Sequence, residues 1–332
     1  MIHIGLCESA LDIRLPESLV EAHSITSHLP FDILCSLGEN QVVCHPDSER
    51  KDMEAEALAL YDTHIHTTLC RHARGEPKEY AAVAEERGLK GIVITCHNPM
   101  PNGWSQAARM YEDQFDEYIA LVSRATEQFR DWMDVRLGLE CDYYPGVEDY
   151  LLRQTESAEF HHILGSVHPH IPEYQKEYET GSPLDYQRTY FEHLALAAET
   201  GLFDTLAHPD FVKVVHPEEW ILDRIMDDIC RTLDRVAASG TAMELSTSGV
   251  LKIVPQMNPG PEILREMHAR GIPVVISSDA HDPQRVGDGF VDALDAAEKA
   301  GYTQVSYFLE RKRWDVDIHR LRGDPRYSRK LQ

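Results

Sequence analysis

The chain has 332 residues and a formal net charge of -24, with 56 acidic against 32 basic side chains. This charge argues against a nucleic-acid or anionic-membrane partner, because both are bound through clustered lysine and arginine. No run of about 18 consecutive apolar residues occurs, which excludes a transmembrane helix. The seven cysteines form no CxxC pair, and the N-terminus lacks the regions of a signal peptide. We therefore expect reduced thiols and a cytoplasmic location.

The first 56 residues show apolar pieces and polar turns but no regular period. We predict that they form an N-terminal extension, separate from a single domain that covers residues 57–332.

From about residue 60, short apolar runs alternate with helical patterns. The runs, which we predict to be strands, are residues 61–66, 91–95, 135–140, 162–167, 203–207, 242–246 and 274–277. The helical patterns cover residues 77–87, 111–129, 184–200, 217–238 and 260–270. Seven strand–helix units in series predict an α/β fold with a parallel sheet closed into a barrel. A last apolar run, residues 304–309, is either an eighth strand or a terminal arm.

The first predicted strand ends in the pair His64 and His66. Side chains at positions i and i+2 of a strand point to the same face, so both rings can reach one metal ion. The pair alone is weak evidence, because 18 histidines among 332 residues produce roughly one such spacing by chance.

The positions of the other metal-capable side chains strengthen this prediction. Active sites of α/β barrels are assembled at the carboxyl ends of the strands. Nearly every predicted strand carries such a side chain at that end or just after it: His64, His66, His72, His97, Glu140, His168, His208, Asp279 and His281.

Nine ligands exceed the three or four that one zinc ion needs. They predict two or three divalent ions, and imidazole with carboxylate suits Zn, Mn or Fe. Sites with several metal ions activate water and stabilise both oxygens of an in-line displacement at phosphorus.

Seven segments resemble, in order, the motifs of the PHP (polymerase and histidinol phosphatase) superfamily, and most closely its histidinol-phosphatase-like branch. The segments are DTHIHTTLCRHA (62–73), CHNPM (96–100), GLECDYYPG (138–146), ILGSVH (163–168), LFDTLAHPDFVK (202–213), ELSTSG (244–249) and SSDAH (277–281). The resemblance implies a distorted seven-stranded barrel of the PHP type with a site for three metal ions.

Carried over motif by motif, the resemblance implies three sets of ligands. One ion takes His64, His66, Glu140 and Asp279. A second shares Glu140 and adds His168 and His208, and a third uses His72, His97 and His281. The resemblance also implies that a hydroxide shared by two ions attacks phosphorus, and that Asp279 or His281 protonates the leaving oxygen, with the choice between them open.

Four positions bear on the substrate and its phosphate. The family usually has Asp where this chain has Cys96, so an orienting carboxylate is absent there unless Cys96 simply packs. An Arg-Lys pair usually meets the substrate phosphate, and here Leu251 and Lys252 occupy those positions, which leaves Lys252 as the candidate contact. Arg109 is either a phosphate clamp or a surface arginine at a helix start.

The sequence thus predicts a metal-dependent phosphatase or phosphoesterase that hydrolyses a small phosphorylated metabolite, with histidinol phosphate the leading substrate. Other phosphoesters, including nucleotides, sugar phosphates and phosphodiesters, are alternatives. Another alternative is an amidohydrolase, which would leave His72, His97 and His281 without a metal. A nuclease module and a degenerate regulatory domain are further alternatives, disfavoured by the acidic charge and by the complete ligand set. The oligomeric state stays open.

Overall fold

The computed structural model describes residues 35–38, 41–44 and 60–323. The chain divides into two compact units, residues 1–52 and 53–332. In the first unit, strands β1 (Cys35–Gly38) and β2 (Gln41–Cys44) pair in antiparallel register. The rest of the predicted extension lies outside the described residues, so its separation from the domain that follows stays a prediction.

Seven parallel strands form the centre of the second unit, and each hydrogen-bonds to its neighbour in chain order. They are β3 (Tyr61–Ile65), β4 (Gly91–Ile94), β5 (Asp134–Asp142), β6 (His162–Ser166), β7 (Thr205–Leu206), β8 (Ala242–Ser246) and β9 (Val274–Ser277). All seven predicted strands are present. β5 runs two residues farther than expected, and β7 is limited to two residues.

The barrel closes between its first and seventh strands, but only near their carboxyl ends. The backbone N–H of His66 donates to the carbonyl of Ala280 at 2.9 Å, and the N–H of Ala280 donates to the carbonyl of His64 at 3.0 Å. Closure through a single residue that follows β9 makes this a distorted (β/α)7 barrel, as predicted.

The last apolar run is a strand that joins the sheet. Strand β10 (Gln304–Leu309) pairs in parallel with β9 and forms an antiparallel pair with β11 (Lys312–Asp317). The ring of Tyr307 on β10 stacks on that of Tyr61 on β3, with ring centroids 4.9 Å apart. β10 therefore packs beside the wide part of the gap between β3 and β9.

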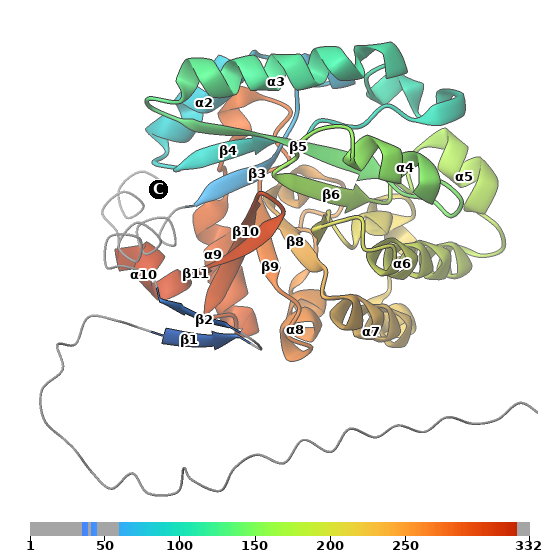
Figure 1. Cartoon of the computed structure of the whole chain (residues 1–332). Helices are drawn as coiled ribbons and strands as arrows, with labels where there is room; N and C mark the ends of the chain where they lie inside the picture. Colours follow the sequence, from blue (N-terminus) through green and yellow to red (C-terminus); the bar gives the residue numbers. More distant parts are fainter. Residues whose placement is uncertain (1–34, 39–40, 45–59, 324–332) are drawn as a thin grey trace, which may run out of the picture. The chain divides into compact units, whose positions relative to one another are not determined.

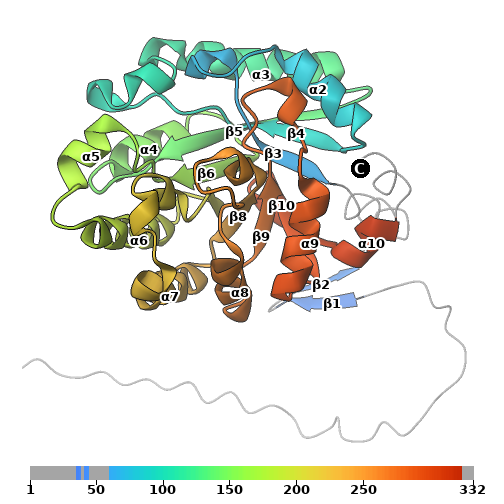
Figure 2. The same cartoon turned by 180° about the vertical axis from the view of Figure 1, so that it is seen from behind.

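Helices surround the strands, as Figures 1 and 2 show from opposite sides. They are α2 (Pro77–Glu86), α3 (Phe115–Phe129), α4 (Glu148–Thr155), α5 (Pro172–Tyr178), α6 (Pro183–Glu199), α7 (Leu222–Ser239), α8 (Pro261–Ala269), α9 (Phe290–Ala300) and α10 (Ile318–Gly323). Two predicted helices start later than expected. Pro217 begins a short 3-10 turn (Pro217–Glu219), and α7 starts only at Leu222. A 3-10 turn (Glu112–Gln114) likewise precedes α3, which starts at Phe115.

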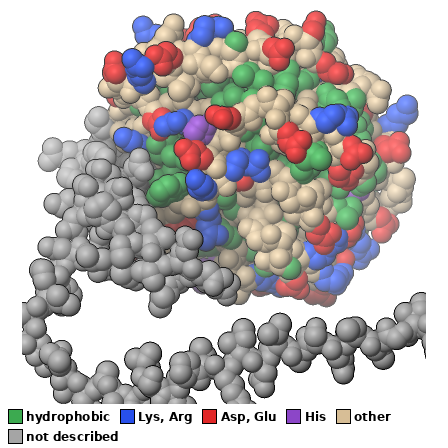
Figure 3. Space-filling view, viewed as in Figure 1, with side chains coloured by type: hydrophobic (Ala, Val, Ile, Leu, Met, Phe, Trp, Pro, Cys, Tyr) green, Lys and Arg blue, Asp and Glu red, His purple; other side chains and the backbone are tan. Residues whose placement is uncertain are grey.

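The strands are buried on both faces, because helices cover the outside and side chains fill the inside. Every residue of β3 is buried, including the polar side chains of Asp62 and His64. Polar groups this deep need partners, and the barrel interior supplies them. On the face seen in Figure 3, acidic and basic side chains are interspersed. Among the described residues, no helix is long and apolar enough to span a membrane.

Candidate metal centre

All nine predicted ligands lie at the end of the barrel where it closes, on strand ends or in the loops that follow them. They converge because parallel strands bring their carboxyl ends to one side. Six of the nine are buried; Asp279 and His281 are partly buried, and His72 is exposed. Six of the nine line a cavity of about 580 Å³: His72, His97, His168, His208, Asp279 and His281.

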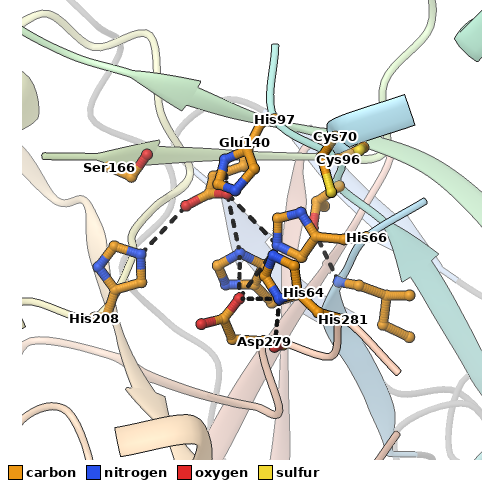
Figure 4. Close-up of polar contacts among 12 residues, drawn as sticks. His64, His66, Cys70, Cys96, His97, Glu140, Ser166, His208, Asp279 and His281 are labelled. Carbon is orange, nitrogen blue, oxygen red and sulfur yellow. Dashed lines mark hydrogen bonds and ion pairs between the residues drawn. The ribbon is translucent and has the colours of Figure 1, made fainter. Parts of the chain in front are cut away.

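Glu140, near the end of β5, lies at the centre of this cluster (Figure 4). Its Oε2 atom lies 3.3 Å from His64 Nε2, 3.6 Å from His66 Nε2 and 2.7 Å from His97 Nδ1. Its Oε1 atom lies 3.4 Å from His168 Nε2 and 3.2 Å from His208 Nε2. One carboxylate thus presents each of its oxygens to a separate group of imidazoles, which is the arrangement that a bridging ligand requires.

Asp279 forms a second focus beside the first. Its Oδ1 atom lies 3.2 Å from His66 Nε2, 3.6 Å from His64 Nε2 and 3.4 Å from His281 Nδ1. The backbone of Asp279 has φ 48°, in the left-handed region. The residue thus combines an unfavourable backbone conformation with a place among candidate ligands, where local strain is commonly concentrated.

The three histidines expected to form a separate set lie together at the cavity mouth. The ring of His281 lies 4.4 Å from that of His72 and 5.9 Å from that of His97, and the His72 and His97 rings are 5.3 Å apart, all between centroids. His66, His97 and His281 also have ligand atoms within 4.8 Å of one another. In an amidohydrolase, these three histidines would bind no metal ion.

Electrostatics favour the metal-binding forms of two members of the cluster, Glu140 and His281. Burial alone would raise the pKa of Glu140, but the rings of His97 and His64 hold it well below its usual range. Burial lowers the pKa of His281 to about 4, despite the nearby carboxylate of Asp279. Glu140 is therefore ionised and His281 neutral near pH 7, the forms in which both groups bind metal ions.

Several buried atoms of the cluster have no hydrogen-bond partner within the described part of the chain. They include His64 Nε2, both ring nitrogens of His66, His281 Nε2 and Glu140 Oε2. Each buried polar atom without a partner costs about 1–3 kcal/mol. Divalent cations would satisfy these lone pairs, and a mixed imidazole and carboxylate set suits Zn, Mn or Fe.

Two buried carboxylates outside the predicted ligand set contact ligand histidines. Glu244 on β8 accepts a hydrogen bond from His64 Nδ1 at 2.7 Å, and Asp142 at the end of β5 accepts one from His168 Nδ1 at 2.6 Å. Asp142 overcomes the effect of burial and raises the pKa of His168 to about 10. Glu244 belongs to the motif ELSTSG, but it lies in the middle of its strand, so the criterion of strand ends did not select it.

Arg109 is not a surface residue, so that interpretation of the sequence was wrong. Its guanidinium is buried, pairs with Asp142 and donates to the carbonyls of Asn98 at 2.9 Å and Ser105 at 3.3 Å. Arg109 also borders the cavity. With its donors directed at these partners, it is better placed to hold Asp142 than to clamp a phosphate.

Lys252 lines the cavity, as a phosphate contact should. The other basic side chains of the lining, Arg74, Arg109 and Arg285, each pair with an aspartate. Lys252 has no ion pair among the described residues, and its ammonium lies 5.3 Å from the centroid of the Phe211 ring. Of the four basic side chains in this lining, Lys252 is therefore the one whose charge is free to attract an anion.

Cys96 packs rather than leaving a polar gap where the family usually has Asp. Its sulfur is buried and accepts hydrogen bonds from the hydroxyl of Thr67 at 3.2 Å and from the backbone N–H of Thr67 at 3.4 Å.

His170, two residues after the candidate ligand His168, also lines the cavity. Its sequence context did not indicate this position.

A PHP domain matches residues 62–248. A probable histidinol-phosphatase from Deinococcus radiodurans is 37% identical over 254 residues, which cover 75% of this chain and 96% of the relative. The histidinol-phosphatase of Bacillus subtilis is 24% identical, with 68% of this chain and 95% of the relative covered.

Among solved structures, the barrel is similar to histidinol phosphate phosphatase from Lactococcus lactis, crystallised with zinc, L-histidinol and phosphate. The TM-score is 0.65 at 18% identity, and the match covers 76% of this chain and 98% of that one. A histidinol phosphatase from Listeria monocytogenes gives a TM-score of 0.62 at 19% identity, with 70% and 99% of the two chains covered. These two likenesses show the fold. Together with the matched domain and the 37% identical relative, they establish that the chain belongs to the PHP family and is a metal-dependent phosphatase of the histidinol-phosphatase-like type.

Proposed function

We propose that this chain hydrolyses L-histidinol phosphate, or a small phosphate monoester of similar size, at a centre of two or three divalent ions. The observation that carries the proposal is Glu140, whose two oxygens face separate groups of histidines across a buried cluster. The substrate is suggested by the relatives, because the 37% identical protein is named a probable histidinol-phosphatase.

The ligand sets would follow the geometry of the cluster. His64, His66, Glu140 and Asp279 would hold one ion, His168 and His208 would share Glu140 around a second, and His72, His97 and His281 would surround a third. Ions bound here would supply Lewis-acid activation of water and of the phosphoryl oxygens. Zinc is supported by its presence in the related Lactococcus lactis structure.

The remaining steps fall to the protein's own side chains. Lys252 would bind a non-bridging oxygen of the phosphate, since its charge has no carboxylate partner in the described structure. Asp279 and His281 both border the cavity, and one of them would take a proton from the attacking water and pass it to the leaving alkoxide. The cavity volume of about 580 Å³ suits a small metabolite.

The direct test is phosphate release from a panel of phosphorylated metabolites, with the metal content of each protein sample measured. L-histidinol phosphate should give the highest kcat/KM of the panel, and activity should disappear when the metals are removed and return when zinc or manganese is restored. A higher kcat/KM with a nucleotide or sugar phosphate would overturn the substrate, and full activity in metal-free protein would overturn the metal centre.

A further inference from the structure

The ring of His64 is held from both sides by carboxylates. Its Nε2 atom faces Glu140 and Asp279, while its Nδ1 atom lies 2.7 Å from Glu244 Oε1. The side chains of His64 and Glu244 are completely buried. An ionised carboxylate only accepts hydrogen bonds, so Nδ1 must carry the proton. A neutral ring with its one proton on Nδ1 would offer the lone pair of Nε2 to a cation bound beside Glu140 and Asp279.

The carboxylate of Glu244 is itself fixed by two other elements of the barrel. Oε2 accepts the backbone N–H of His208 at 2.6 Å, and Oε1 also accepts the hydroxyl of Ser277 at the end of β9. Both oxygens of Glu244 are therefore engaged by donors of the protein. Glu244 is better explained as a support for a ligand than as a ligand.

The same arrangement occurs at His168, on the other side of Glu140. Asp142 Oδ1 accepts a hydrogen bond from His168 Nδ1 at 2.6 Å, while His168 Nε2 lies 3.4 Å from Glu140 Oε1. The second oxygen of Asp142 is held by Arg109 and by Trp104 Nε1, the latter at 3.3 Å. The Arg109 guanidinium balances the charge of Asp142 within the barrel.

Other histidines of the cluster have weaker support. The Nδ1 atoms of His72 and His281 lie 2.8 Å and 3.1 Å from the backbone carbonyls of Cys70 and Asp279. Neither ring nitrogen of His66 has a hydrogen-bond partner among the described residues. Two rings, His64 and His168, are thus supported from behind by a carboxylate that is outside the proposed ligand set, and they face opposite oxygens of the central Glu140.

We propose that Glu244 and Asp142 are positioning residues that keep His64 and His168 in the Nδ1–H form, so that Nε2 is the metal-binding atom of each. The proposal rests on the proposed metal centre. A carboxylate behind a ligand imidazole fixes its orientation and raises its basicity, and loss of such a partner commonly lowers metal affinity about 10- to 100-fold.

The first test replaces each carboxylate with its amide. Glu244 accepts hydrogen bonds from His64, Ser277 and the backbone N–H of His208. The amide of Glu244→Gln has one acceptor oxygen and cannot accept all three. Either one hydrogen bond is lost, or the proton of His64 moves from Nδ1 to Nε2. Zinc affinity, measured by competition with a chelator, should fall about 10- to 100-fold in Glu244→Gln and in Asp142→Asn. Glu127→Gln, on the exposed surface of α3, is the matched control and should keep wild-type affinity. Folded variants with wild-type zinc affinity would overturn the proposal.

A second measurement does not depend on whether the variants fold. In zinc-loaded wild-type protein labelled with ¹⁵N-histidine, nitrogen NMR should show protonated Nδ1 and zinc-bound Nε2 for His64 and His168, with His64→Gln and His168→Gln used for assignment. Zinc on Nδ1 with a proton on Nε2 would refute the positioning role. Failure of the wild-type protein to bind zinc, manganese or iron would instead refute the proposed metal centre.

Discussion

At the scale of single residues, the site depends on one carboxylate that faces five imidazoles. Glu140 is completely buried, and the rings of His97, His64, His168 and His208 stabilise its charge. Removing the carboxylate therefore affects metal binding and catalysis together.

Glu140→Ala should abolish phosphatase activity and the tight binding of at least one ion. The loss of activity should exceed about 100-fold, since even partners outside the ligand shell are worth 10- to 100-fold. Metal analysis of the purified variant, beside a phosphate-release assay, checks both effects. Glu159→Gln, an exposed acidic residue, serves as control. Unchanged metal content and rate in Glu140→Ala would show that the centre is elsewhere.

Lys252→Ala tests the phosphate contact. A hydrogen bond to a charged group is worth about 1.5–3 kcal/mol, so kcat/KM should fall about 10- to 100-fold, with metal content unchanged. Lys252→Arg keeps the charge and should recover part of the loss. If Lys252→Ala has wild-type kcat/KM, phosphate is bound by other groups of the cavity.

Arg109→Met should reduce stability because it leaves the carboxylate of Asp142 buried without its cation. Breaking a buried pair in this way costs about 3–5 kcal/mol, which urea unfolding can measure. Arg188→Met breaks the exposed pair with Asp228 and should cost no more than about 1 kcal/mol. Equal costs for both variants would contradict the structural role of Arg109.

The convergence of the nine candidate ligands was predictable because one rule, side chains at strand ends, selects them. The two carboxylates that hold His64 and His168 from behind, Glu244 and Asp142, were not predictable by that rule. Asp142 lies beyond the predicted end of β5, since the strand continues two residues past Glu140. Glu244 lies inside β8, where an acidic side chain is compatible with burial only because donors from other strands surround it. Contacts between residues 180 positions apart in the chain leave no local pattern.

At the scale of elements, the predicted alternation of strands and helices is correct in order and mostly in extent. Errors occur where local signals are ambiguous: Pro217 suits the first turn of an α-helix, yet it begins an isolated 3-10 turn. The short helices α4 and α5, of eight and seven residues, are too brief for a clear period. Tertiary contacts rather than local pattern define such short elements.

Two glycines that follow helices should lose different amounts of folding free energy when replaced by alanine. Gly240 follows α7 with φ 79°, and a Cβ there would meet only open space. Gly240→Ala should therefore cost about 1 kcal/mol, the backbone penalty alone. Gly301, after α9, has φ 113°, and its Cβ would lie 2.5 Å from His268 Cε1. Gly301→Ala should thus lower the free energy of unfolding by more than Gly240→Ala, and a smaller or equal loss would contradict the packing described.

At the scale of the whole molecule, the barrel and the metal centre use the same residues. The hydrogen bonds that close the barrel run between Ala280 and the backbones of His64 and His66, and Ala280 separates Asp279 from His281. Four candidate ligands therefore flank the backbone bridge between β3 and Ala280. Binding of ions to these side chains would be expected to stabilise the closed barrel by mass action.

Metal removal should lower the melting temperature, and the loss should be reversed when zinc is restored. It should also speed hydrogen exchange at the amides of His66 and Ala280 more than at interior amides such as Val93 on β4. Exchange that accelerates uniformly, or not at all, would show that metal binding does not stabilise the closure of the barrel. If the exchange at His66 and Ala280 accelerates as predicted, the ion held by His64, His66, Glu140 and Asp279 would also join the first strand to the chain after the seventh, and a cell short of metal would hold a phosphatase whose barrel is loosened along one side.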